Sequence, residues 1–115
     1  MGLSLPDTSA WIEQHVVRNA LKGVGEFTPG SDAQMEELTP IFAALSSFSG
    51  LPVWVHTFHP VGIGGLKILM RLCEEYPSVP VIFGHMGGIH WMEAIAFAKN
   101  HNNVYLDLSA AFTTL

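Results

Sequence analysis

Two kinds of apolar pattern alternate along this chain: short continuous runs, and longer stretches in which apolar residues recur about once per helical turn. The continuous runs are too apolar to leave one face in water, which favours buried strands of a parallel sheet. They predict four strands, from Leu21 to Phe27, Pro52 to Thr57, Val79 to Gly84 and Val104 to Leu108.

The stretches with helical spacing lie before and between these runs, so helix and strand alternate along the chain. Start and stop signals place their ends, such as Thr39 as an N-cap before Pro40 in the first helical position. The predicted helices are one capped by Asp7 or Thr8, one from Thr39 to Gly50, one from about Leu66 to Tyr76 and one from about His90 to Lys99. This order predicts an α/β fold in which right-handed crossovers join neighbouring parallel strands.

The amino-acid composition mainly excludes other classes of protein. Of the 115 residues, 49% are hydrophobic and 13% are charged, which indicates one core-rich domain over residues 1–115. The net charge is -5 and the five Lys and Arg residues are scattered, so no nucleic-acid partner is expected. No run approaches the ~18 apolar residues of a membrane span, and the N-terminus lacks a signal-peptide pattern. The cytoplasm is therefore the expected location, without a membrane partner.

The single cysteine, Cys73, excludes an internal disulfide. It lies in an apolar stretch with helical spacing, so we expect it to pack in the core. The three tryptophans, Trp11, Trp54 and Trp91, are expected to be core residues as well.

Two of the predicted strands end on a histidine and pass directly into a glycine-containing loop. His56 ends Leu-Pro-Val-Trp-Val-His, and His85 ends Val-Pro-Val-Ile-Phe-Gly-His. The carboxyl ends of parallel strands are where α/β folds place their chemistry. Because the same pattern occurs twice, one strand and helix apart, the two histidines are the strongest functional signal in the sequence.

Alternate side chains of a strand share a face, which extends this signal to all four strands. Counting back from each carboxyl end puts Trp54 on the face of His56, and Val81 and Phe83 on the face of His85. The ionisable residues predicted to share that face are Glu26, His56, His85 and Asp107. Converging nitrogen and oxygen donors are what Zn²⁺ or a similar divalent ion requires, and they equally serve as acid and base beside such an ion.

Each of these residues also has a structural interpretation. A strand histidine can be a hydrogen-bonded core residue, Glu26 can cap a loop, and Asp107 can be a structural hydrogen-bond acceptor. His59 and His90 fall in loops at the same end, where they either contact substrate or are simply exposed. We carry His59 and His90 forward as substrate-binding candidates.

The strand ends together resemble the amidohydrolase superfamily: Gly-Val-Gly-Glu-Phe, the runs ending on His56 and His85, and Asn-Val-Tyr-Leu-Asp-Leu-Ser. The similarity runs from about Leu21 to Ala110 and is nearest to the branch of aminocarboxymuconate-semialdehyde decarboxylase. It implies a metal-dependent (β/α)8 barrel whose fourth to seventh strands are present. By resemblance, His56 binds the metal, and His85 acts in catalysis or as a further ligand. Glu26 lies at the end of the family's fourth strand, where relatives carry different residues, so the resemblance says little about its role.

Two features of that family are missing from the sequence. No His-x-His pair precedes His56, and no strand ending in a catalytic Asp follows. We therefore expect a partial TIM barrel, inactive alone, with an open face that leads to a homo-oligomer or to pairing with a complementary barrel half.

Three functions remain open at this point. The first is a hydrolase or decarboxylase that uses a divalent ion, most simply Zn²⁺, on a small organic substrate. The second is a non-catalytic barrel fragment that acts by assembling with itself or with another chain. The third is a small open α/β binding domain, which leaves the two strand-end histidines unexplained.

Overall fold

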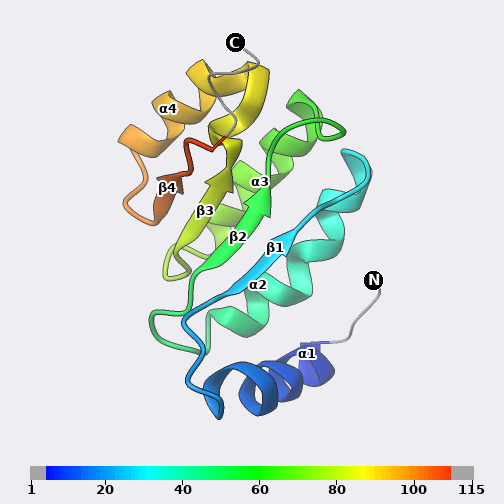
Figure 1. Cartoon of the computed structure of the whole chain (residues 1–115), viewed down its shortest axis with the longest axis vertical. Coiled ribbons are helices and arrows are strands. Elements are labelled where there is room, and N and C mark those ends of the chain that lie inside the picture. Colours follow the sequence, from blue (N-terminus) through cyan, green and yellow to red (C-terminus); the bar gives the residue numbers. More distant parts are fainter. Residues whose placement is uncertain (1–4, 110–115) are drawn as a thin grey trace.

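Four short parallel strands form one sheet in the order β1-β2-β3-β4 (Figure 1). The computed structural model describes residues 5–109 of the chain. The strands are β1 Val24–Phe27, β2 Val53–His56, β3 Val81–Gly84 and β4 Val104–Leu106. Every neighbouring pair is parallel, so the predicted topology is confirmed, with strands shorter than the apolar runs suggested.

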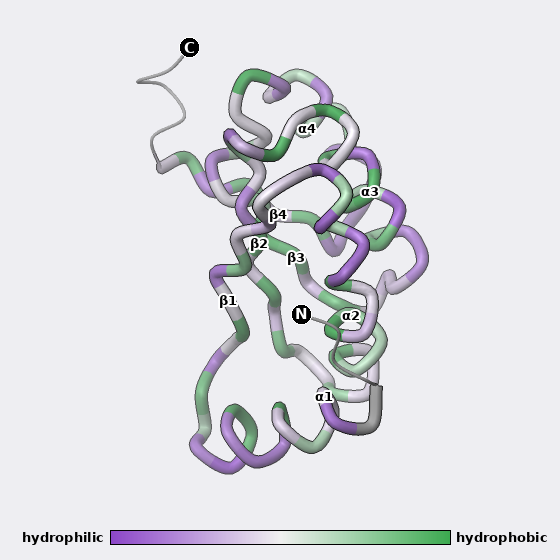
Figure 2. Tube along the Cα trace, turned by 90° about the vertical axis from the view of Figure 1, so that its right-hand side faces the viewer, coloured by the Kyte–Doolittle hydropathy of each residue, from purple (hydrophilic) through white to green (hydrophobic). Residues whose placement is uncertain are grey.

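Helices connect the strands and gather on one side of the sheet. The α-helices are α1 Leu5–Ile12, α2 Thr39–Leu45, α3 Ile63–Glu75 and α4 Trp91–Lys99. Seen edge-on, the strands lie on one side and α2, α3 and α4 on the other, while α1 lies at one end, where it packs on α2 (Figure 2). No helix in the described range is long and apolar enough to cross a membrane.

The two faces of the sheet differ in what they contact. Val53 and Val55 on β2 pair with Val81 and Phe83 on β3, and all four side chains are fully buried in the core. The alternate positions form a row across the other face, in which Trp54 pairs with Ile82 and Ile82 with Tyr105. Trp54 is 39% exposed and Tyr105 is 55% exposed, so this row lies on an open face.

This register corrects the predicted faces of β3. Val81 and Phe83 do not share the face of Trp54; Ile82 does. The error arose because counting back from His85 assumed extended backbone throughout. The strand instead ends at Gly84, and His85 has a φ of 67°, which breaks the alternation of side chains.

Four helix boundaries also differ from the predicted ones. Asp7 and Thr8 lie inside α1, after its first residue Leu5, and α2 ends at Leu45, well before Gly50. Thr39 is the first helical residue of α2 and not its cap, because a short 3-10 helix, Ala33–Leu38, runs directly into α2. The Thr39 hydroxyl donates to the carbonyl of Glu36 at 2.8 Å.

The fourth boundary is the start of α3, which begins at Ile63, before the predicted Leu66. The Asp32 carboxylate accepts a hydrogen bond from the Gly62 amide at 2.6 Å, which satisfies a free N–H group at that helix terminus.

Cys73 is buried in the core as predicted, and its burial, together with the negative charge of Glu74, raises the pKa of the thiol to about 12. The tryptophan prediction was wrong, since Trp11 is 53% exposed, Trp54 lies on the open face, and Trp91 is half-buried outside the core cluster. Trp54 thus lines the side of the sheet that carries the candidate site.

Candidate metal centre

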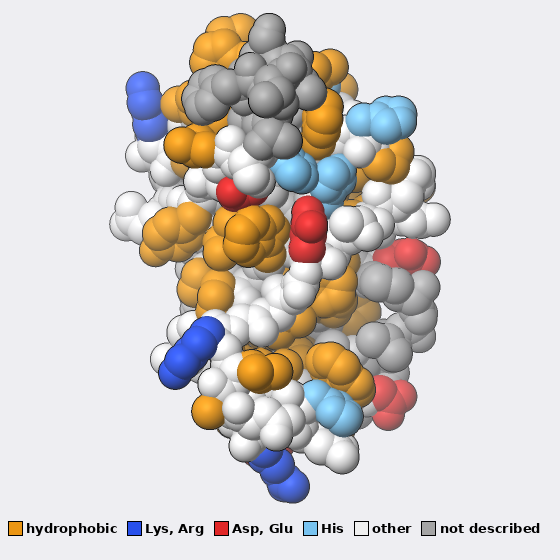
Figure 3. All heavy atoms as spheres, in the orientation of Figure 1, with side chains coloured by type: hydrophobic (Ala, Val, Ile, Leu, Met, Phe, Trp, Pro, Cys, Tyr) orange, Lys and Arg blue, Asp and Glu red, His pale blue; other side chains and the backbone are white. Residues whose placement is uncertain are grey.

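Three predicted site residues come together at the carboxyl edge of the sheet. Glu26 on β1, His56 at the end of β2 and His85 directly after β3 each offer a donor atom, and these atoms lie within 4.8 Å of one another. Both histidines are half-buried, and Glu26 is exposed. In Figure 3, acidic and histidine side chains gather on this face of the molecule above a band of hydrophobic side chains.

The Glu26 carboxylate lies close to one nitrogen of each imidazole ring. Its Oε2 atom is 3.3 Å from Nδ1 of His56 and 3.9 Å from Nε2 of His85. The two rings are 4.9 Å apart between centroids and meet edge to face at 77°. The predicted juxtaposition of His56 and His85 is therefore confirmed.

The hydrogen bonds of the outer ring nitrogens determine the tautomer of each neutral imidazole. Nε2 of His56 lies 2.8 Å from the carbonyl oxygen of His59, and Nδ1 of His85 lies 2.7 Å from that of Ser109. Since a carbonyl only accepts, each of these nitrogens carries the proton and donates it. In the neutral rings, the lone pairs are then on Nδ1 of His56 and Nε2 of His85, the two atoms that face Glu26.

This arrangement fits a cation. Two imidazole lone pairs and a carboxylate oxygen are all acceptors, so they repel one another unless a proton or a metal ion lies between them. Metal-binding histidines in proteins characteristically donate their other N–H to a backbone carbonyl or a carboxylate, as both rings do here. The donor set of Glu26, His56 and His85 thus suits a divalent metal.

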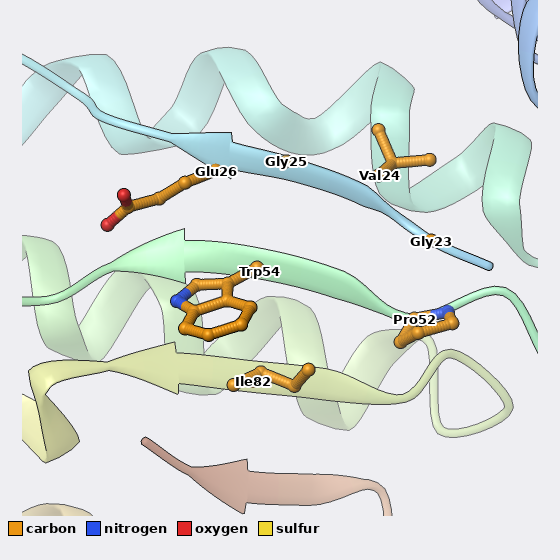
Figure 4. A pocket seen from close by; sticks show the side chains of 7 residues that line it. All are labelled: Gly23, Val24, Gly25, Glu26, Pro52, Trp54 and Ile82. Atoms are coloured by element: carbon orange, nitrogen blue, oxygen red, sulfur yellow. The ribbon is translucent and has the colours of Figure 1, made fainter. Parts of the chain in front are cut away.

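The chain reaches this geometry at β1 through a bulge. Gly25 pairs with Trp54 and Phe27 with Val55, which leaves Glu26 outside the regular register. Gly25 has a φ of 132°, and a Cβ there would lie 2.5 Å from the Trp54 carbonyl oxygen, so only glycine fits. Figure 4 shows the resulting path: the Glu26 carboxylate points toward the carboxyl ends of the strands, beside Trp54.

A second glycine keeps the centre of the site open. Gly84 pairs with His56, and a Cβ on it would lie 2.8 Å from Nε1 of Trp54 and 3.3 Å from Oε2 of Glu26. Any larger residue would therefore push into the space between the indole and the carboxylate.

A hollow of about 340 Å³ adjoins the site on the open face (Figure 4). Glu26 lines it together with two members of the row, Trp54 and Ile82. The lining residues are Gly23, Val24, Gly25, Glu26, Pro52, Trp54 and Ile82. Its walls are mostly apolar, with the carboxylate at the end nearest the histidines.

Asp107 does not offer a donor to this group. Its Oδ2 atom accepts the backbone N–H of His85 at 3.2 Å and also the hydroxyl of Ser109. Burial acts to raise the pKa of Asp107, but hydrogen bonds from Ser109 and His85, with the positive charge available on His85, together lower it. Asp107 is thus a structural acceptor behind His85.

His59 and His90 lie at the same end of the sheet but apart from the donor group. Only the backbone of His59 contacts it, through the hydrogen bond from His56. The two side chains line a separate hollow of about 240 Å³, together with residues such as Phe58 and Ile89. Their contact with substrate stays a prediction.

Sequence reasoning missed Thr57 altogether. Its hydroxyl donates to the Gly84 carbonyl at 2.6 Å and accepts the Gly87 amide at 2.7 Å, which links β2 to the turn carrying His85. A threonine in a strand is too common to stand out, and the only sequence signal is its position directly after His56.

The chain belongs to the amidohydrolase family, because a family model described as Amidohydrolase matches residues 1–114. Among solved structures it is similar to an uncharacterized TIM-barrel protein, Bb4693, from Bordetella bronchiseptica, with 20% identity and a TM-score of 0.54. That match covers 92% of this chain and 49% of the other, so the chain spans about half the length of this relative. No curated protein matches it at a significant level.

These likenesses confirm the superfamily and the fold expected from the sequence. The fold is α/β, with four parallel strands and flanking helices that correspond to part of a TIM barrel. The decarboxylase-like branch, by contrast, stays a prediction.

Proposed function

We propose that this chain carries part of the metal centre of an amidohydrolase-type enzyme, a hydrolase or decarboxylase acting on a small organic substrate. The observation that carries the proposal is the convergence of Glu26, His56 and His85 with both imidazole lone pairs turned inward. Membership of the amidohydrolase family supports the reaction class. The cytoplasmic location expected from the sequence belongs to the same proposal.

The metal that best suits this donor set is Zn²⁺, since two imidazoles and one carboxylate are typical zinc ligands. When bound, such an ion polarises a carbonyl group or lowers the pKa of a water molecule. His56 and Glu26 are assigned as metal ligands. His85 lies beside them, where it serves either as a third ligand or as the group that holds a proton near the substrate oxygen.

The remaining residues of the site are proposed to bind the substrate and to keep water out. Trp54 and Ile82 form an apolar wall beside Glu26, which favours the carbon skeleton of a small substrate and keeps water from part of the site. His59 and His90 are proposed to contact the polar end of the substrate from the neighbouring hollow.

A second candidate function is assembly. Within the described range, β1 pairs only with β2 and β4 only with β3, so both outer strands have open edges. The exposed row of Trp54, Ile82 and Tyr105 adds apolar surface between those edges. Both features suit a second copy or a complementary barrel half.

The first test is a titration with Zn²⁺ alone, followed through the imidazole signals of the chain by NMR. We expect saturable binding that shifts the signals of His56 and His85 together and is lost on dialysis, because few donors are present. His56→Ala should abolish it, whereas His15→Ala, which removes an exposed histidine on another element, should not. Absence of saturable binding, or its persistence in His56→Ala, would count against the proposal.

A further inference from the structure

The backbone that presents His85 has an unusual conformation. His85, Met86, Gly87 and Gly88 have φ values of 67°, 44°, 88° and 58°, so four consecutive residues lie at positive φ. Glycine adopts such angles readily, but His85 and Met86 carry a Cβ and do so at a cost. Residues in this region persist where their surroundings hold them, and they concentrate at functional sites.

Thr57 binds the backbone of this turn at Gly84 and Gly87. Its side chain is 2% exposed, and its hydroxyl bridges the Gly84 carbonyl before the turn and the Gly87 amide within it. The backbone amide of Thr57 also donates to the Gly84 carbonyl, at 3.1 Å. One buried side chain directly after β2 therefore ties together two points that flank His85.

Asp107, which follows β4, holds the first residue of this turn, His85. Its Oδ2 atom accepts the N–H of His85, and its Oδ1 atom accepts the N–H of Ser109 at 3.1 Å. The Ser109 carbonyl in turn accepts Nδ1–H of the His85 ring. Asp107 thus fixes both the backbone of His85 and the group that sets its tautomer.

We propose that Thr57 and Asp107 are positioning residues which hold the His85 imidazole against Glu26 with its Nε2 lone pair turned toward the metal site. Neither side chain offers a donor to the group of Glu26, His56 and His85, so both act through His85. The inference rests on the proposed function for the identity of the ligand. The geometry of His85, however, can be measured without any metal.

The experiment compares the wild-type chain with Thr57→Val and Asp107→Ala. Thr57→Val keeps the shape of the side chain and removes the hydroxyl, and Thr57→Ser restores the hydroxyl. Without metal, the amides of His85 and Gly87 are followed by hydrogen exchange, and the His85 tautomer by the ¹⁵N signals of its ring. With Zn²⁺ as the probe, affinity is measured by the same NMR titration.

We expect Thr57→Val to speed exchange at Gly87, and Asp107→Ala to speed exchange at His85 and to mix its tautomers. Each should weaken Zn²⁺ binding by about 10- to 100-fold, the usual effect of removing an outer hydrogen bond at a metal site. Thr57→Ser should recover most of that affinity. Wild-type exchange and tautomers in Thr57→Val and Asp107→Ala, or no recovery in Thr57→Ser, would overturn the inference.

Asn103→Ala is the matched control. Asn103 bridges the carbonyls of Cys73 and Val79 at 3.1 Å each, at the amino end of the sheet and away from His85. It should lower stability while leaving the His85 tautomer and Zn²⁺ affinity unchanged. If the wild-type chain binds no Zn²⁺, the proposed function fails, and the exchange and tautomer measurements still decide the roles of Thr57 and Asp107.

Discussion

Nδ1 of His56 lies 3.3 Å from Oε2 of Glu26, and in the neutral histidine neither atom carries a hydrogen. The reason is the bond on the other side of the ring, where Nε2 donates to the His59 carbonyl. Two acceptors at this distance are stable only with a cation between them or with a second proton on the ring. The site is therefore built for positive charge, and this relationship can be tested by changing Glu26.

Glu26→Gln should move two properties in opposite directions. The amide of Gln can donate to Nδ1 of His56, so stability without metal should rise by about 0.5–1 kcal/mol, the net value of one hydrogen bond. Zn²⁺ affinity should fall at least about tenfold, because an anionic ligand is lost. Thermal unfolding in a chelator and Zn²⁺ titration measure the two effects. A gain in affinity would contradict the assignment of Glu26 as a ligand.

The sheet order and the meeting of His56 with His85 could be predicted because both depend on local patterns. Apolar runs set the strands, and parallel strands bring their carboxyl ends to one edge. The orientation of β3 could not be predicted in the same way, since His85 leaves the extended backbone one residue after Gly84. Nothing in the apolar pattern marks that change.

The supporting residues depend on contacts that the sequence does not display. Thr57 is linked to Gly87 across 30 positions, and Asp107 to His85 across 22. Asp32 likewise accepts a hydrogen bond from the Gly62 amide, at the start of α3, from 30 positions away. Such contacts arise only when the chain has folded, so spacing and periodicity do not reveal them.

The acid stability of the chain should depend on Asp107. Its pKa is lowered in the folded state, so it binds a proton less readily there than in the unfolded chain, and its ionised form stabilises the fold. That contribution is fully present above the unfolded pKa of about 3.9 and is lost as the pH falls through the lower folded pKa. The stability difference between wild type and Asp107→Asn should therefore shrink below about pH 4.

Denaturant unfolding at several pH values measures this difference. Asn103→Ala serves as the control because it removes no ionisable group, so its stability deficit should stay constant across the same range. A difference between wild type and Asp107→Asn that stays constant down to the lowest pH would contradict the role given to the Asp107 carboxylate.

Gly84→Ala should damage the site more than the fold. The added Cβ would lie 2.8 Å from Nε1 of Trp54 and 3.3 Å from Oε2 of Glu26, so both side chains must move. We expect a loss of about 1–3 kcal/mol of stability from overpacking, together with weaker Zn²⁺ binding and a shifted Trp fluorescence spectrum. Gly50→Ala is the control, since its φ is 78° but nothing lies within 4 Å of the added Cβ. It should lower stability and leave Zn²⁺ affinity unchanged.

The last prediction concerns the exposed row of Trp54, Ile82 and Tyr105. Apolar surface of this kind, flanked by two open strand edges, favours association, so the isolated chain should form dimers or larger species. Tyr105→Glu places a charge on that face beside the open edge of β4 and should shift the chain toward monomer in sedimentation velocity at matched concentrations. Met92→Glu changes another exposed apolar residue, on α4, and should leave association unchanged. A wild-type chain that sediments as a stable monomer would show that this face does not drive assembly.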